Sequence, residues 1–174
     1  MTLTSPTEAA LDAALGEALY KEPKFSEWFL GRTRFRGEIA SCVFCRYNNP
    51  WSRVRLERRN PLSGGLEVLL SECETDVLAV YETGNGRRLA LHVENKLAGG
   101  SFTRLQPELY RARLQQWKNR PKLGDYIDAT SILVAPKQFF ERYRAQAEIF
   151  ETYVSHEELA ERIPLFSQSS DGGT

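Results

Sequence analysis

Two apolar runs separated by turn residues limit the folds open to this chain more than any other feature. Residues 75–81 form a short run rich in β-branched side chains, residues 88–97 form a second run, and Thr83-Gly84-Asn85-Gly86 lies between them. This pattern predicts a β-hairpin. If the hairpin is symmetric about Asn85, residues whose numbers sum to 170 face each other, so Asp76 lies opposite Glu94 with Cβ atoms about 5 Å apart.

Side chains alternate along a strand, so Glu94 and Lys96 are expected on one face of this hairpin. That face also holds Ala90 and His92, whereas the opposite face holds Leu89, Leu91 and Val93. Two carboxylates as close as Asp76 and Glu94 repel each other unless a cation lies between them, and their oxygens suit a hard ion such as Mg²⁺. A lysine beside them can activate a metal-bound water or neutralise charge on a pentavalent phosphate. The pattern therefore indicates hydrolysis of phosphodiester bonds.

The order strand, turn, strand and helix start resembles the PD-(D/E)XK nuclease superfamily. An Asp begins the first strand, Glu94-Asn95-Lys96 ends the second, and Gln106-Pro107-Glu108-Leu109-Tyr110 is similar to the Gln-x-x-x-Tyr helix motif of exonuclease-type members. The resemblance covers residues 66–136 well and the amino-terminal helix more loosely. It departs from the superfamily's name at Thr75, where the name has Pro.

The resemblance implies an α/β fold of the restriction-endonuclease type, with a mixed sheet of four to five strands flanked by helices. It also implies a nuclease that depends on Mg²⁺ or Mn²⁺ and has nucleic acid, with DNA preferred, as its partner. In such a site Asp76, Glu94 and the backbone carbonyl of Asn95 bind the metal, and Lys96 orients or activates the attacking water. Gln106 and Tyr110 position the scissile strand.

A glutamate of the first helix often reaches the metal in the resembled superfamily. Glu8 is the candidate here, with Glu17 behind it. Each assignment has a plainer alternative: a solvated helix-terminal acid for Glu8 or Glu17, a helix cap for Gln106 and a core aromatic for Tyr110. Two other functions stay open, namely nucleic-acid binding or complex assembly without significant cleavage, and a chance match in which the hairpin charges form a solvated edge.

Charge is distributed unevenly along a chain whose formal net charge is zero. Residues 31–60 contain eight arginines and two glutamates, and residues 100–122 contain six basic residues and one glutamate. Both segments flank the proposed site, which predicts a phosphate-facing surface, or alternatively a solvated arginine-rich face. The first segment also carries Phe35, Phe44, Tyr47 and Trp51, and arginines interleaved with aromatic residues can bind phosphates and stack on bases.

Cysteine usage and hydropathy bear on the compartment. The three cysteines, Cys42, Cys45 and Cys73, leave a remainder in any disulfide framework, which favours a reducing compartment. The chain has no apolar run of 18 residues, and its amino terminus lacks signal-peptide features, so we expect a cytoplasmic protein without a membrane partner. A zinc site built on Cys42 and Cys45 with Cys73, His92 or His156 is less favoured than half-buried thiols.

The remaining elements follow from periodicity and capping signals. A single domain is expected over residues 1–166, with a disordered tail at 167–174 and a homodimer left open. We expect one or two helices over 7–29 interrupted at Pro23, a first sheet strand over 66–71, a helix over 107–118, a parallel strand over 129–135, and closing helices over 138–153 and 156–162. Ser155 caps the last of these through a capping box with Glu158. His92 is interpreted as a hydrogen-bonded core residue and His156 as a surface residue.

Overall fold

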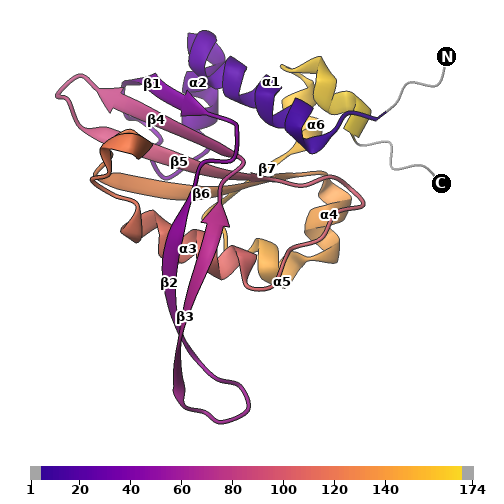
Figure 1. Cartoon of the computed structure of the whole chain (residues 1–174). Helices are drawn as coiled ribbons and strands as arrows, with labels where there is room; N and C mark the ends of the chain where they lie inside the picture. The colour runs from indigo at the N-terminus through magenta and orange to yellow at the C-terminus, as the bar shows by residue number, and fades with distance from the viewer. Residues whose placement is uncertain (1–4, 170–174) are drawn as a thin grey trace.

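The computed structural model of the protein describes residues 5–169, and these residues form an α/β fold (Figure 1). A mixed five-stranded sheet has the order β1-β4-β5-β6-β7, and β2 (Trp51–Arg59) and β3 (Leu66–Glu74) form a separate two-stranded sheet. The five-stranded sheet contains β1 (Ala40–Arg46), β4 (Val77–Thr83), β5 (Arg88–Asn95), β6 (Asp128–Ala135) and β7 (Thr152–Ser155). The predicted fold class, a mixed sheet of four to five strands flanked by helices, is confirmed.

Helices cover both faces of the sheet. The first face carries α1 (Glu8–Lys21), α2 (Pro23–Leu30), α6 (His156–Ala160) and the 3₁₀ helix η2 (Pro164–Ser169). The second face carries α3 (Gln106–Gln116), α4 (Lys137–Arg142) and α5 (Arg144–Ala147), and the 3₁₀ helix η1 (Pro121–Leu123) follows α3. Because both faces are covered, the central strands are almost continuously buried.

The central hairpin has the predicted register. Val77 pairs with Val93 and Leu78 with His92, so the residue numbers of each pair sum to 170. Leu89, Leu91 and Val93 pack into the core beneath α1, whereas Ala90 packs on the α3 side. The predicted parallel pairing of β5 with β6 is also confirmed.

Local helix signals are confirmed in three places. Pro23 separates α1 from α2 and occupies the first turn of the second helix. Pro107 lies in the first turn of α3. Ser155 accepts a hydrogen bond from the Glu158 backbone, and the Glu158 side chain returns to the Ser155 backbone, which completes the predicted capping box.

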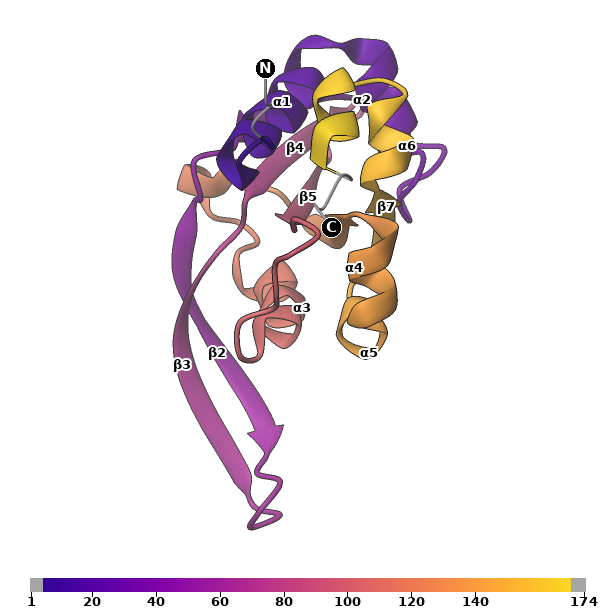
Figure 2. The same ribbon diagram turned by 90° about the vertical axis from the view of Figure 1, so that its right-hand side faces the viewer.

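The strand expected at residues 66–71 belongs to a different sheet, so that prediction was wrong. β3 (Leu66–Glu74) pairs antiparallel with β2 (Trp51–Arg59), and the two form an arm that projects from the body (Figures 1 and 2). The place beside β4 is taken by β1, a segment that the sequence left unassigned. Alternating side chains identify a strand but not its partner, and Leu66, Val68 and Leu70 all face outward in the arm.

The closing part of the chain differs from expectation in two further ways. The helix predicted over 138–153 ends early, since α5 stops at Ala147 and β7 (Thr152–Ser155) joins the sheet beside β6. Four residues are too few to show a strand period, so the sequence did not reveal β7. Of the tail predicted to be disordered, residues 167–169 belong to η2, and residues 170–174 lie outside the described part. No helix within residues 5–169 is long and apolar enough to cross a membrane.

Candidate active site

Asp76 and Glu94 meet where the central hairpin joins the rest of the chain. The Asp76 backbone N–H donates to the Val93 carbonyl at 3.2 Å, and the Asn95 N–H donates to Asp76 Oδ2 at 2.7 Å. The second bond holds the Asp76 carboxylate against the end of β5. The Glu94 carboxyl is almost fully buried beside it.

Lys96 and Gln106 converge on one oxygen of Glu94. The Lys96 ammonium lies 2.6 Å from Glu94 Oε1, and the Gln106 amide donates to the same oxygen, also at 2.6 Å. The prediction that Lys96 lies on the same side as Glu94 is therefore confirmed. Gln106 brings the start of α3 into the site and contacts the acid directly.

The electrostatics of this site disfavour two free carboxylates. Burial, together with the charges of Glu94 and Asp12, raises the pKa of Asp76 to about 9. Burial also raises the pKa of Glu94, although the Lys96 ammonium opposes the shift. Burial disfavours the ammonium of Lys96, but the Glu94 carboxylate outweighs this effect and the pKa of Lys96 is raised. An added cation would relieve the repulsion between the acids.

The first helix places two acidic residues near the end of β5: Glu8, which was predicted, and Asp12, which was not. Glu8 Oε1 accepts from the Leu97 N–H at 3.3 Å, so its side chain reaches the end of β5. Glu17 instead is exposed and pairs with Lys21 at 3.2 Å, away from the site. Asp12, one turn after Glu8, is buried and accepts from the Asn95 side-chain amide at 2.9 Å, and burial raises the pKa of Asp12 to about 7. The sequence signal that we missed is the four-residue spacing, which places Glu8 and Asp12 on one helix face.

His156 lies in the core, so its assignment to the surface was wrong. Its Nε2 lies 2.9 Å from Asn95 Oδ1 and its Nδ1 lies 2.6 Å from Ser169 Oγ. Burial lowers the pKa of His156 to about 4, which keeps the ring neutral at pH 7. A hydrogen-bonded chain thus runs from Asp12 through Asn95 and His156 to Ser169. Ser155, by capping α6, places the next residue in its first turn.

Tyr110 lies inside the molecule. Its hydroxyl donates to the Val93 carbonyl at 3.1 Å, and the Arg113 guanidinium lies 3.5 Å above its ring. Arg113 is itself buried and donates to the Glu74 backbone carbonyl, so it does not belong to a phosphate-facing surface. Tyr110 therefore packs against the hairpin as a core aromatic residue, which is the alternative interpretation of this residue given by the sequence.

His92 and the cysteines have the environments expected of structural residues. His92 is fully buried, and its Nε2 lies 2.8 Å from the Tyr126 hydroxyl, as predicted for a core histidine. Cys42, Cys45 and Cys73 are free thiols of intermediate burial. Across residues 5–169, no group of three or more His, Cys, Asp or Glu side chains is arranged to hold one metal ion.

The basic segments are more neutralised than their composition indicates. Five arginines of residues 31–60 have acidic partners: Arg32 with Glu158, Arg34 with Asp128 and Glu151, Arg53 with Glu72, Arg55 with Glu57, and Arg58 with Glu67. In the second segment Lys118 lies 3.7 Å from Asp128. Within the described residues, the cations near α3 that are left for a phosphate are therefore Arg104, Arg111, Arg120 and Lys122.

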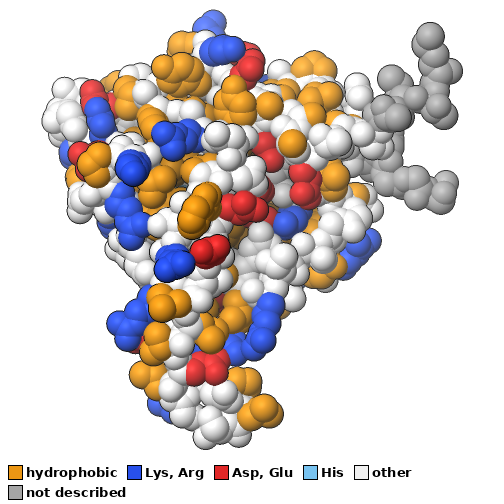
Figure 3. Space-filling view, viewed as in Figure 1, with side chains coloured by type: hydrophobic (Ala, Val, Ile, Leu, Met, Phe, Trp, Pro, Cys, Tyr) orange, Lys and Arg blue, Asp and Glu red, His pale blue; other side chains and the backbone are white. Residues whose placement is uncertain are grey.

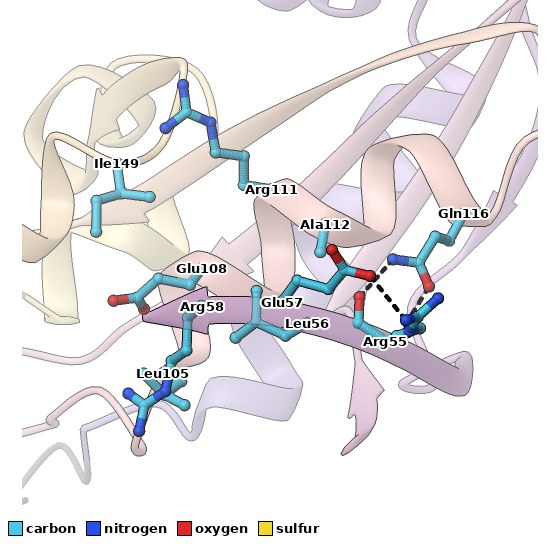
Figure 4. Close-up of a pocket in the computed structure, with 10 residues that line it drawn as sticks. All are labelled: Arg55, Leu56, Glu57, Arg58, Leu105, Glu108, Arg111, Ala112, Gln116 and Ile149. Carbon is cyan, nitrogen blue, oxygen red and sulfur yellow. Dashed lines mark hydrogen bonds and ion pairs between the residues drawn. The ribbon is translucent and has the colours of Figure 1, made fainter. Parts of the chain in front are cut away.

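A hollow of about 680 Å³ lies between β2 of the arm and α3, and neither Asp76 nor Glu94 lines it (Figure 4). Arg55 lines it: the Arg55 guanidinium lies 2.8 Å from Glu57, and the Arg55 backbone N–H donates to the Gln116 side chain. A smaller hollow of about 420 Å³ reaches Gln106 and Tyr110 and so approaches Glu94. We assign the site by its chemistry and not by the size of the hollow, because the perturbed carboxyls lie at the hairpin. Comparison of the chain with models of protein families, with curated proteins and with solved structures found no match.

Proposed function

We propose that this protein is a metal-dependent nuclease of the restriction-endonuclease-like type that hydrolyses phosphodiester bonds in nucleic acid, with DNA as the preferred substrate. The observation that carries the proposal is the convergence of Asp76, Glu94 and Lys96 at the end of one hairpin. Lys96 Nζ lies 2.6 Å from Glu94, and Asp76 is held against the same strand end by the Asn95 N–H. The free cysteines fit the cytoplasmic location that we also propose.

The donor set fits Mg²⁺ or Mn²⁺. Asp76, Glu94 and the Asn95 carbonyl would hold the ion, with Glu8 and Asp12 beyond them. Hard oxygen donors of this kind suit Mg²⁺, which keeps several waters and so needs few protein ligands. Burial raises the pKa of both carboxyls, neighbouring acids add to the shift at Asp76, and a bound cation would oppose these shifts. When bound, the ion supplies Lewis-acid polarisation of the phosphate and a more acidic water.

The chain's own residues orient the reacting groups. Lys96 would hold the attacking water near the acids and stabilise negative charge on the phosphate. Gln106 fixes Glu94 Oε1 through its 2.6 Å hydrogen bond, and the Asn95 N–H fixes Asp76 Oδ2. Asp12 and His156 hold the Asn95 side chain from two directions, which stiffens the end of β5 next to Glu94.

The test compares two substitutions for metal affinity and for cleavage. Lys96→Ala should keep Mg²⁺ or Mn²⁺ binding, measured by calorimetry, but should lose roughly 10²-fold or more in cleavage rate, because one preorganised charge is removed. Asp76→Ala should lose metal binding and cleavage together. Lys24→Ala, a change at an exposed residue of α2, should match the wild type in both measurements. Linear, circular and single-stranded DNA and RNA serve as substrates.

Two results would count against hydrolysis at this site. Equal cleavage by the wild type and Lys96→Ala, at matched purity, would place the catalytic group elsewhere. Saturable metal binding without cleavage of any substrate would support the alternative, a domain for nucleic-acid binding or assembly. The presence of Asp, Glu and Lys together argues against that alternative, since a degenerate site is expected to lose one of them.

A further inference from the structure

Trp51 is exposed at the point where the arm leaves the body. It opens β2, and 63% of its surface is accessible, whereas Trp117 is fully buried and Trp28 packs against the core. Figure 3 shows acidic, basic and hydrophobic side chains gathered where the arm meets the body. An exposed tryptophan offers a large flat face for contact with a ligand.

Trp51 separates two hollows of opposite character. The first, of about 420 Å³, extends to Gln106, whose side chain donates to Glu94 at 2.6 Å. The second, of about 480 Å³, is lined by Arg120 and Lys122 of the segment that follows α3. Trp51 lines both hollows, so its ring stands between the proposed cleavage site and a pair of cations.

The two cations are available to a ligand. Neither Arg120 nor Lys122 forms an ion pair with any residue in the range 5–169, and the Arg120 guanidinium donates to Ser52 Oγ at 2.6 Å. This bond holds the Arg120 guanidinium at Ser52, which follows Trp51 in the sequence. Two acids of the arm, Glu72 and Glu74, line the first hollow and not the second; Glu74 pairs in register with Trp51, and Glu72 lies 3.5 Å from Arg53.

An aromatic platform next to free cations is the combination that binds single-stranded nucleic acid, because a base stacks on the ring while the cations bind phosphates. Bases inside a duplex are stacked on their neighbours and offer no free face. We propose that Trp51 stacks on an unpaired nucleobase of the substrate, with Arg120 and Lys122 on the adjacent phosphates. This inference rests on the proposed function and narrows the substrate to nucleic acid that is single-stranded beside the cleaved bond.

Intrinsic fluorescence tests the stacking without requiring cleavage. The full chain is titrated with oligo(dT), oligo(U) and a blunt DNA duplex in buffer with a chelator. We expect the single strands to quench the tryptophan fluorescence of the wild type. The Trp51→Phe variant should lose most of that quenching, because Trp117 is buried and Trp28 packs against the core. The duplex should bind more weakly and quench little. The oligo(dT) and oligo(U) arms show whether the strand is DNA or RNA.

Measurements of single-strand affinity compare Trp51→Ala with a control substitution on the same arm. Trp51→Ala should weaken single-strand binding by roughly fivefold to a hundredfold, the usual effect of losing one stacking side chain. Leu66→Ala removes another exposed apolar side chain of the same arm, 73% exposed and outside both hollows, and should bind like the wild type. Lys122→Gln should weaken binding and lower the slope of its salt dependence by about one.

Several outcomes would overturn the stacking proposal: unchanged affinity in Trp51→Ala, equal quenching by duplex and single strand, or a Trp51→Ala chain that sediments as a monomer where the wild type is a dimer. The last result would place Trp51 in an interface between copies. Failure of the two proposals can be told apart. Cleavage that needs Asp76 but ignores Trp51 refutes stacking alone, whereas quenching that needs Trp51 without cleavage under Mg²⁺ or Mn²⁺ refutes hydrolysis alone.

Discussion

Asp76 is an acidic residue whose buried position disfavours its charged form. Its carboxyl is held by the Asn95 N–H, yet burial and the charges of Glu94 and Asp12 raise its pKa to about 9. Without a metal the residue therefore keeps its proton at neutral pH. A bound cation would change the preferred protonation state and link metal binding to pH.

Asp76→Asn should stabilise the metal-free protein at neutral and alkaline pH. The folded-state pKa of about 9 lies above the ordinary Asp pKa of 3.8, so the wild type should lose stability as the pH rises from about 4 to 9. We expect the variant to gain on the order of 2 kcal/mol at pH 7 and to show a flatter pH dependence. Urea unfolding from pH 5 to 9 in chelator measures this, with Glu17→Gln as the exposed control. A wild type whose metal-free stability rises over that range would contradict the argument.

His156→Gln should reduce the acid sensitivity of the fold. The pKa of His156 is about 4, below the ordinary His pKa of 6.5, so its contribution to stability is present above pH 6.5 and is lost as the pH falls through 4. This loss amounts to about 3 kcal/mol in the wild type. The variant should be less stable at pH 7 by about 1–3 kcal/mol, because Asn95 and Ser169 lose a partner.

Urea unfolding at pH 7, 5.5 and 4.5 measures both effects. Glu161→Gln, an exposed change just after α6, is the control and should follow the wild type. His92 has a lowered pKa as well, so part of the acid sensitivity should persist in the variant. An unchanged pH slope in His156→Gln would show that the ring is not buried in its neutral form.

At the scale of elements, α3 connects the site to the arm. Its first residue, Gln106, contacts Glu94, and its last residue, Gln116, bonds the backbone of Arg55 in β2 through both of its side-chain polar atoms. Arg120, beyond the helix, reaches Ser52. The arm is therefore fixed at its base by the same segment that supports the acids, although its outer half projects freely (Figure 2).

Gly124→Ala tests how the segment after α3 packs on the sheet. Gly124 has φ +91°, and an added Cβ would lie 2.7 Å from Val80 Cγ2 and 3.2 Å from Phe44. Left-handed backbone and overpacking together should cost about 2–4 kcal/mol, measured by thermal or urea unfolding. Gly84→Ala, in the hairpin turn with nothing within 4 Å of its added Cβ, is the matched control and should change stability little. Equal effects of the two changes would contradict this packing.

At the scale of the whole molecule, a formal net charge of zero hides a local asymmetry. Ion pairs such as Arg32 with Glu158 and Arg34 with Asp128 connect the segment before β1 to α6 and β6. The arginines of residues 31–60 therefore serve partly to hold the fold together. Apart from the buried Arg113, the cations near α3 that form no ion pair within residues 5–169 are Arg104, Arg111, Arg120 and Lys122.

Binding to nucleic acid should weaken steeply with salt, since each neutralised phosphate releases counterions. If three or four of the cations near α3 contact a single strand, the plot of log affinity against log salt should have a slope of about −2 to −3. Fluorescence titrations with oligo(dT) from 50 to 300 mM NaCl measure this slope. A flat dependence would remove phosphate contact from the mechanism.

The sequence by itself determined the features that depend on neighbours along the chain. The turn at residues 83–86 sets the register that pairs Val77 with Val93 and so brings Asp76 to the end of β5. Pro23 and Pro107 begin helices, and Ser155 caps α6. Each depends on backbone geometry within a few residues, which the amino-acid types control directly. The same local pattern placed Lys96 on the face of Glu94.

Only the tertiary structure decided which segments cover one another. An alternating pattern identified β3 as a strand but could not show that it pairs with β2, nor that β1 and β7 complete the main sheet. The burial of Asp12, Arg113 and His156 likewise comes from contacts with distant residues: Asn95 for Asp12 and His156, and Glu74 for Arg113. Polar residues are usually exposed, and only a partner far away in the sequence makes their burial favourable.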